Sequence, residues 1–236
     1  SSNASGISKY YEQLGKEDYY TQGGEPLGYW LGRGAEKLGL SGPVQEGELL
    51  RAMQGEHPST GQALARNAGD DHAPGWDATF SAPKSVSTVW AVTDRDAQSA
   101  IQRAQAEAVK AAIGYIEREA TFTRYGAGGL EREPVTLHGG LIVAAYEHST
   151  SRNTDPQLHT HCIIANITPD GRGLDLDTRH KMAAGALYRV ELANQLREIG
   201  FAIERDGDSF RIAGVSAKLT EHWSSRHAQV RQAMAD

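Results

Sequence analysis

Two short apolar runs joined by a polar loop constrain the fold of this chain more than any other feature. The first run covers residues 140–148 and ends on His148, and the second covers residues 156–166. Both have the length and the apolar, β-branched content of buried strands. The residues between them, Ser149 to Asp155, are mostly polar turn formers. We therefore predict that the two strands pair antiparallel within a sheet.

The second run carries two histidines separated by one residue. Because side chains alternate along a strand, His159 and His161 point to one face, whereas Thr160 and Cys162 point to the other. Pairing of the two strands can bring His148 beside them. Three neutral imidazoles with further positions open are typical of a catalytic metal site, since a structural zinc site takes a fourth protein ligand. The plain alternative is a chance pair with a packing role.

Composition is that of an ordinary globular protein. The 236 residues suffice for one large domain, or for one domain with an appendage, and 39% are hydrophobic and 23% charged. No apolar run has the length of a membrane span and no secretory leader is seen, so we expect no membrane insertion. The single cysteine excludes an intramolecular disulfide and suits a reducing compartment. A net charge of -6 argues against indiscriminate coating of nucleic acid, yet it permits a local basic groove.

Two tyrosine pairs lie near the start of the chain, Tyr10-Tyr11 and Tyr19-Tyr20. A single tyrosine is usually a packing residue with a solvated hydroxyl. Four of them in one short, polar and partly acidic stretch are harder to explain as core. A phenol becomes a nucleophile once its proton is removed or a metal polarises its target.

A predicted strand-to-helix junction covers residues 75–91. Apolar residues alternate with Asp77 and Thr79 in a pattern that predicts a strand with an acid on its polar face. Ser81 and Pro83 are start signals for a helix running through residues 89–91. Lys84 and Ser85 then lie at a helix N-terminus, where backbone N–H groups favour phosphate. A solvated strand acid and a surface lysine are the plain alternatives.

The remaining pattern completes an α+β fold. We predict a helix over residues 95–120 capped by Asp94, a strand over 121–125, a helix over 181–199, a hairpin around 206–208 and a helix over 216–235. The apolar stripe of the 181–199 helix is predicted to be Met182, Leu187, Val190, Leu192, Leu196 and Ile199. We expect a central antiparallel sheet with flanking helices and central histidine strands, a tyrosine segment across its open face, and a C-terminal helical flap.

Several motifs together resemble a known family. Residues 75–87, His148 followed by residues 150–152, and residues 155–166 are similar to the conjugative relaxases of the MobF class, the TrwC type. These belong to the HUH superfamily of single-strand DNA endonucleases. The resemblance runs from about Tyr10 to the helix that contains Ala193 and Asn194. It implies a relaxase palm over residues 1–167, and an extension over 168–236 that closes over DNA.

The resemblance implies a role for each candidate residue. His148, His159 and His161 match the histidines that hold a divalent cation, most often Mg²⁺ or Mn²⁺, with Zn²⁺ or others serving in vitro. Asp77 matches an acid that acts as general base or orients a ligand histidine. The other matches are the nucleophile Tyr10, Tyr19 for the second strand transfer, the auxiliary Tyr11 and Tyr20, and the DNA-binding Lys84, Ser85 and Arg152.

The implied activity is metal-assisted nicking of one strand at a plasmid origin of transfer. It leaves a 5′-phosphotyrosine and a free 3′-OH, and it can be reversed to join strands. Implied partners are single-stranded origin-of-transfer DNA, relaxosome accessory proteins and a coupling protein. A helicase domain that continues the chain, a bacterial cytoplasmic location and transfer into a recipient cell are implied as well.

Three other functions fit parts of the pattern. A rolling-circle replication initiator shares the chemistry but lacks the Phe80–Ser87 context. A metal-dependent hydrolase would use water and would never attach to DNA. A DNA-binding module would use its histidines structurally and would not cut its ligand.

Overall fold

The computed structural model describes residues 4–6, 9, 27–151 and 155–223. A four-stranded sheet has the order β1-β5-β6-β2. Its strands are β1 (Tyr29–Leu31), β5 (Val143–Thr150), β6 (Pro156–Ala165) and β2 (Gly75–Ser81), and β1 pairs antiparallel with β5. The predicted α+β class and the two histidine strands at the centre of the sheet are confirmed.

Contacts divide the chain into two compact units that interleave along the sequence. The first comprises residues 1–79, 112–147 and 161–184, and the second comprises residues 80–111, 148–160 and 185–236. The boundary therefore passes through β2, β5 and β6. The division into a palm over 1–167 and an extension over 168–236 stays a prediction.

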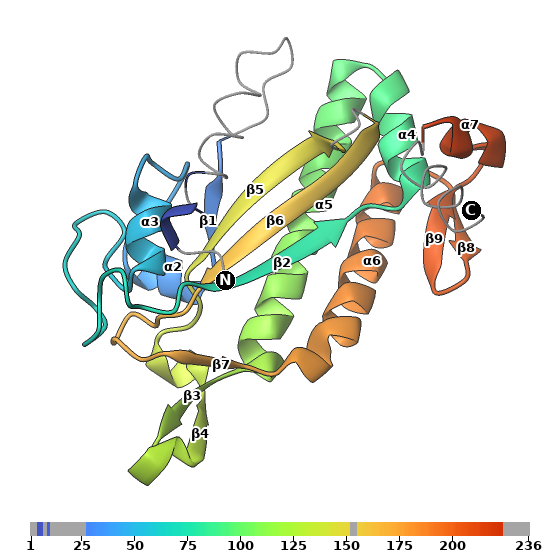
Figure 1. The fold of residues 1–236 in the computed structure, drawn as a ribbon. Coiled ribbons are helices and arrows are strands. Elements are labelled where there is room, and N and C mark those ends of the chain that lie inside the picture. Colours follow the sequence, from blue (N-terminus) through green and yellow to red (C-terminus); the bar gives the residue numbers. More distant parts are fainter. Residues whose placement is uncertain (1–3, 7–8, 10–26, 152–154, 224–236) are drawn as a thin grey trace, which may run out of the picture. The chain divides into compact units, whose positions relative to one another are not determined.

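The first unit contains a second antiparallel sheet, of order β4-β3-β7. Its strands lie side by side in Figure 1: β3 (Thr121–Tyr125), β4 (Glu131–Pro134) and β7 (Leu174–Leu176). The unit also contains α2 (Arg33–Lys37), α3 (Glu48–Met53) and the short helices η1 (Ile116–Ala120), η2 (Ala127–Gly129), η3 (Val135–His138) and η4 (Thr178–His180).

Two apolar clusters attach α2 and α3 to one face of β5 and β6. Leu49 and Met53 of α3 pack with Tyr146 and Ile163. A second cluster joins residues of both helices to Ala165 of β6 and to Ile142, which directly precedes β5. Strand alternation means that the next residues on this face are His148, two after Tyr146, and His161, two before Ile163.

Glycines set where two of the strands begin. At Gly75, φ is 132°, and a Cβ atom there would lie 2.0 Å from the carbonyl oxygen of Ile164, so only glycine permits this approach of β2 to β6. Gly139 and Gly140 also have positive φ, of 98° and 92°. A positive φ is incompatible with a regular strand at Gly140, the predicted start, and β5 begins at Val143 instead. The strand continues two residues beyond His148.

Glu117 is a buried carboxylate in the π-helical turn η1, with 3% of its surface exposed. Its Oε2 accepts hydrogen bonds from the backbone N–H groups of Arg33, at 3.1 Å, and of Leu141, at 2.9 Å. The Arg33 guanidinium lies 3.2 Å from Oε1. One side chain thus joins the start of α2 to the segment that leads into β5.

Replacing Glu117 with alanine should lower the free energy of unfolding by about 3 kcal/mol, because the buried N–H of Leu141, the part-buried N–H of Arg33 and the exposed Arg33 guanidinium lose their acceptor. The melting temperature should fall by roughly 6–12 °C. Thermal and urea unfolding would measure both quantities. Glu119→Ala is the matched control, since Glu119 is an exposed glutamate of the same turn. Equal losses in the two variants would contradict the structural role of Glu117.

Glu48, the first residue of α3, is buried among donors. Its oxygens accept hydrogen bonds from Gln45 N, at 3.0 Å, from Trp30 Nε1, at 3.2 Å, and from Ser59 Oγ, at 2.8 Å. Burial alone would raise the pKa of Glu48, but these hydrogen bonds and the nearby charge of Arg51 outweigh it and hold the pKa below its ordinary value.

A depressed carboxyl pKa stabilises the fold above the ordinary pKa of 4.5, and this stability is lost as the pH falls through the lower folded pKa. Glu48→Gln should therefore be less stable than the wild type at neutral pH, and the difference should shrink below that ordinary pKa. Urea unfolding along a pH series measures the difference. Glu46→Gln makes the same charge change at an exposed position. A stability difference between Glu48→Gln and the wild type that does not vary with pH would contradict the lowered pKa of Glu48.

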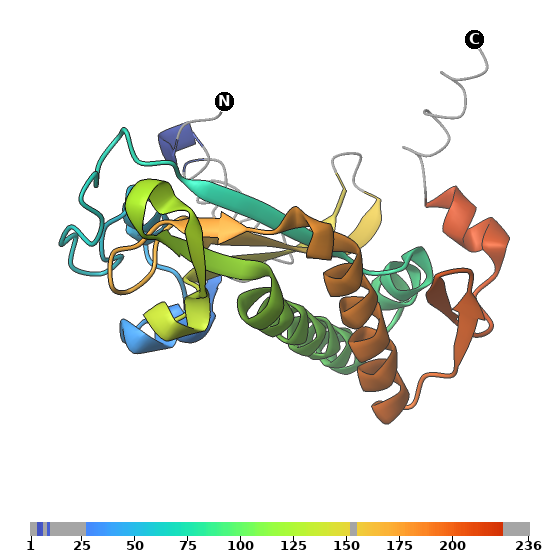
Figure 2. The same ribbon diagram turned by 90° about the horizontal axis from the view of Figure 1, so that it is seen from below.

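The second unit is mainly helical. Its elements are α4 (Lys84–Val92), most of α5 (Arg95–Tyr115), most of α6 (Lys181–Glu198), the hairpin β8 (Ile203–Asp206) and β9 (Ser209–Ile212), and α7 (Ala217–His222). Helix α4 lies beside β9 and α7, as Figures 1 and 2 show. Asp94 caps α5 as predicted, because its Oδ1 accepts from Ala97 N at 2.9 Å.

A buried amide network joins α5, α6 and β6 within this unit. Gln105 Nε2 donates to Phe80 O and to Thr160 Oγ1, both at 3.3 Å, and Gln105 Oε1 accepts from the Tyr188 hydroxyl at 2.6 Å. The Phe80 and Tyr188 rings lie 5.3 Å apart. Tyr188 is therefore an anchor of α6.

The predicted apolar stripe of α6 was wrong in part. Met182, Val190 and Ile199 are 75%, 56% and 43% exposed. The buried line instead runs through Tyr188, Leu192 and Leu196, because the contacts of Tyr188 turn that face inward. Of the predicted helix over 216–235, the described part of the chain includes α7 up to His222.

In the part of the chain that the structure describes, no helix is long and apolar enough to cross a membrane.

Candidate functional site

The alternation predicted for the histidine strand is confirmed. On β6, Leu158, Thr160 and Cys162 are 4%, 0% and 0% exposed, whereas His159 and His161 are partly exposed. The two histidines therefore lie on the face opposite Leu158, Thr160 and Cys162. Burial raises the pKa of the Cys162 thiol well above its ordinary value, and the charges of Asp77 and Glu147 add to the effect.

In the second unit, the imidazole rings of His148 and His159 lie together. Their centroids are 5.2 Å apart and their planes are tilted by 34°. His159 Nδ1 lies 2.9 Å from the carbonyl oxygen of Gln157. A carbonyl only accepts, so Nδ1 carries the proton and the lone pair of His159 is on Nε2. This tautomer is typical of metal-ligating histidines.

In the first unit, His161 is paired with Asp77 of β2. The distance between His161 Nδ1 and Asp77 Oδ2 is 2.9 Å. Thr79 Oγ1 lies 3.1 Å from the same nitrogen and donates to Asp77 Oδ1 at 3.3 Å. An ionised carboxylate accepts a hydrogen bond from Nδ1–H. The proton therefore stays on Nδ1, and the lone pair of His161 is again on Nε2.

Helix α4 supports the segment that carries His159. The Leu158 N–H donates to Ser87 Oγ at 3.0 Å, and the Leu158 carbonyl accepts from Ala82 N at 2.9 Å. Lys84 Nζ donates to Pro156 O at 2.8 Å. Burial lowers the pKa of Lys84, and the charge of Asp155 opposes this shift.

The serine predicted to bind phosphate is largely buried. Ser85 is 6% exposed, and its Oγ accepts from the Ile212 N–H of β9 at 3.1 Å. This contact attaches the C-terminal hairpin to α4 and leaves Ser85 little surface for DNA. The DNA contacts of Lys84 and Ser85 stay predictions.

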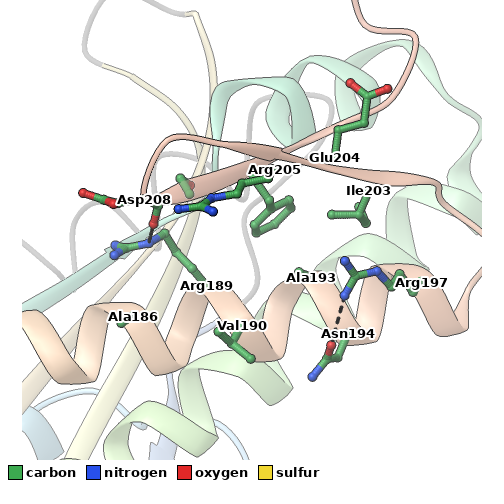
Figure 3. Close-up of a pocket in the computed structure, with 12 residues that line it drawn as sticks. Ala186, Arg189, Val190, Ala193, Asn194, Arg197, Ile203, Glu204, Arg205 and Asp208 are labelled. Carbon is green, nitrogen blue, oxygen red and sulfur yellow. Dashed lines mark hydrogen bonds between the residues drawn. The ribbon is translucent and has the colours of Figure 1, made fainter.

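A pocket of about 260 Å³ lies between α6 and the hairpin β8–β9. Figure 3 shows the residues that line it. Arg189 Nε donates to Asp208 O at 3.2 Å, and Arg197 Nη1 donates to Asn194 Oδ1 at 3.3 Å. Arg205 also lines the pocket, whose remaining walls include Val190, Ala193, Ile203 and Phe210. The lining thus combines three arginines and an apolar floor with the acidic residues Glu204 and Asp208. Its guanidinium groups suit phosphate and flat rings.

Two parts of the sequence-based site remain predictions. Tyr10, Tyr11, Tyr19, Tyr20 and Arg152 lie outside the described residues. Within residues 4–6, 9, 27–151 and 155–223, no group of three or more His, Cys, Asp or Glu side chains is arranged to hold a metal ion.

Sequence reasoning missed the part played by Thr79, which contacts both Asp77 and His161. The available signal was its spacing, because a residue two positions after Asp77 on a strand lies on the same face. The contacts of Gln105 gave no local signal, since they join segments far apart in the chain.

Comparison with known proteins places this chain in a family. A family model described as TrwC relaxase matches residues 4–236. The chain belongs to the TrwC relaxase family. This confirms the resemblance to MobF-class relaxases. The multifunctional conjugation protein TraI of Escherichia coli K12 is 34% identical over 254 residues, which cover 99% of this chain and 14% of that protein.

Solved structures of TrwC agree with the fold of this member of the TrwC relaxase family. A copper-bound complex of TrwC with oriT DNA has a TM-score of 0.80 and 33% identity, and covers 96% of this chain and 78% of that one. A TrwC complex with a 27-mer DNA comprising the recognition hairpin and the cleavage site has a TM-score of 0.76 and 30% identity, and covers 98% and 79%. TrwC has been solved with oriT DNA in metal-bound and metal-free forms.

Proposed function

We propose that this chain is a relaxase domain that nicks one strand of origin-of-transfer DNA by tyrosine transesterification. The observation that carries the proposal is the anchoring of both β6 histidines through Nδ1. Gln157 O holds His159, and Asp77 Oδ2 holds His161, each at 2.9 Å. Family membership supports the proposal, since TrwC is solved in complex with oriT DNA and TraI is a conjugation protein.

We assign His148, His159 and His161 as the residues that would hold a divalent cation. Their chemistry fits this role, because Nε2 is the ligating nitrogen in both histidines of β6 and an imidazole set accepts several divalent metals. When bound, the cation supplies positive charge to the non-bridging oxygens of the scissile phosphate. Neutral ligands leave that charge largely intact. Mg²⁺ and Mn²⁺ are the proposed metals, with Zn²⁺ as the comparison.

The nucleophile is the phenol of Tyr10, assigned by resemblance. Its oxygen attacks phosphorus, its proton passes to water, and the bond from phosphorus to the 3′ oxygen breaks. The 3′ oxygen takes up a proton from water, so the products are a 5′-phosphotyrosine and a free 3′-OH. One phosphoester bond forms as another breaks, so the step is reversible and strands can be rejoined. Tyr19 performs the second transfer, and Tyr11 and Tyr20 are auxiliary.

Of the two roles open to Asp77, we assign the orienting one. Its Oδ2 accepts from His161 Nδ1, so the carboxylate holds the ring in the ligating tautomer. A carboxylate engaged in this way is poorly placed to take the proton of a phenol elsewhere. We therefore do not assign Asp77 as the general base.

The proposed ligand is single-stranded origin-of-transfer DNA. Lys84 and Arg152 are proposed phosphate contacts, and the arginines of the α6 pocket add guanidinium groups suited to phosphate. Relaxosome accessory proteins, a coupling protein and a following helicase domain are proposed by family analogy, together with action in the bacterial cytoplasm and transfer to a recipient. TraI is called multifunctional, and the chain spans 14% of its length.

The test uses oligonucleotides from a panel of candidate origins of transfer, each labelled at its 3′ end. After incubation with Mn²⁺ or Mg²⁺, a denaturing gel should show labelled protein that disappears with a chelator. Because the 5′ phosphate of the downstream fragment is attached to tyrosine, the 3′ label stays with the protein. A hydrolase would release the labelled fragment, and a binding module would leave the strand intact. A replication initiator would instead react with replication-origin oligonucleotides.

A further inference from the structure

Thr79 completes a small network on the polar face of β2. Its hydroxyl lies 3.1 Å from His161 Nδ1 and donates to Asp77 Oδ1 at 3.3 Å, while Asp77 Oδ2 lies 2.9 Å from that nitrogen. All three side chains belong to the first unit. Asp77 and Thr79 share a face of the strand because they are two positions apart.

The distances within this network constrain where its protons lie. The Thr79 hydroxyl proton goes to Asp77 Oδ1, so Thr79 Oγ1 has lone pairs to offer His161. The single proton on Nδ1 is then shared between Asp77 Oδ2 and Thr79 Oγ1. The neutral tautomer with its only proton on Nε2 is disfavoured, since its unprotonated Nδ1 would face the carboxylate with a lone pair.

Thr79 has a second effect on the carboxylate itself. Asp77 is an exposed side chain, and a carboxylate on a strand can rotate about its terminal torsion. The hydrogen bond from Thr79 to Oδ1 fixes that rotation and keeps Oδ2 directed at His161. Thr79 therefore orients the His161 ring both by its own contact with Nδ1 and by holding Asp77 in place.

We propose that Thr79 is a positioning residue that fixes the tautomer and orientation of His161, and so sets the affinity of the site for its metal. This rests on the proposed function, in which His161 is a metal ligand. Residues that hydrogen-bond to a metal-ligating histidine commonly change the affinity for the metal by about 10-fold or more when they are replaced. Thr79 is exposed, so its hydroxyl contributes little to the core.

Titration of the metal-free protein with Mn²⁺ alone, followed by calorimetry, tests the proposal. Thr79→Val, which keeps the shape and removes the hydroxyl, should raise the dissociation constant about 5-fold, the value of one hydrogen bond of about 1 kcal/mol. Thr79→Ser keeps the hydroxyl and should stay within about 2-fold of the wild type. Melting temperatures of the two variants should match that of the wild type.

Side-chain ¹⁵N NMR of the metal-free protein provides a readout that needs neither metal nor DNA. The wild type and Thr79→Ser should show His161 protonated on Nδ1, and Thr79→Val should show a larger share of the other tautomer. Wild-type affinity in Thr79→Val, or equally weak binding in Thr79→Ser, would overturn the role of Thr79.

Two further variants separate this proposal from the proposed function. If Thr79 acts partly through Asp77, the effects of Thr79→Val and Asp77→Asn should not add in the double variant, and additivity would overturn this coupling. His161→Ala should abolish most Mn²⁺ binding. Undiminished binding in His161→Ala would overturn the metal site itself, whereas loss in His161→Ala without loss in Thr79→Val would overturn only the proposal for Thr79.

Discussion

Tyr10→Phe is expected to yield no covalent protein–DNA band with an origin oligonucleotide that the wild type cleaves. Phenylalanine has no oxygen to form the phosphoester, so the loss should reach the detection limit of the gel. Binding of the uncleaved strand should change little, because the aromatic ring is retained. Adduct formation on a denaturing gel and strand binding by anisotropy would be measured on the same preparation.

Tyr19→Phe is the matched control, since it removes the corresponding hydroxyl of the second pair. It should keep the first adduct and lose the later transfer of a second strand. An undiminished adduct in Tyr10→Phe would exclude Tyr10 as the nucleophile. Tyr11→Phe and Tyr20→Phe would then show which phenol carries the reaction.

His161→Ala is expected to lower the single-turnover rate of adduct formation by at least about 100-fold at fixed Mn²⁺, corresponding to about 2.7 kcal/mol of lost transition-state stabilisation. The variant removes a ligand and also leaves Asp77 without the imidazole that it orients. Raising the Mn²⁺ concentration should restore part of the rate, because the defect lies chiefly in metal occupancy.

His57→Ala controls for the loss of an imidazole elsewhere in the same unit. His57 Nδ1 accepts hydrogen bonds from the backbone N–H groups of Ser59 and Thr60, so its role is local to that turn. Its variant should keep the nicking rate within about 2-fold of the wild type, because these hydrogen bonds lie within its own turn. A wild-type rate in His161→Ala would exclude this residue from the metal site.

The sequence predicted well those features that depend on local pattern. The strand β6 and its alternation followed from an apolar run with turn formers at each end. The junction of β2 and α4 followed from alternation before Ser81 and the helix start at Pro83, and the cap at Asp94 is equally local. Each of these needs only a few neighbouring residues to be specified.

Features that depend on distant partners could not be predicted. Glu117 looked like one glutamate among several on a long helix, yet it accepts from the backbone N–H groups of Arg33 and Leu141. The face of α6 was misjudged for the same reason, because Tyr188 counts as only moderately apolar until its contact with Gln105 is known. The tyrosine pairs and Arg152 stay predictions from resemblance.

Helix α4 touches the histidine strand through one serine and the C-terminal hairpin through another. Ser87 holds Leu158, the neighbour of His159, and Ser85 holds Ile212 of β9. Because these two serines lie in the first turn of α4, one helical turn holds both the backbone beside His159 and the C-terminal hairpin. Ser85→Ala should therefore loosen the hairpin, and faster hydrogen exchange of the Ile212 amide would measure it.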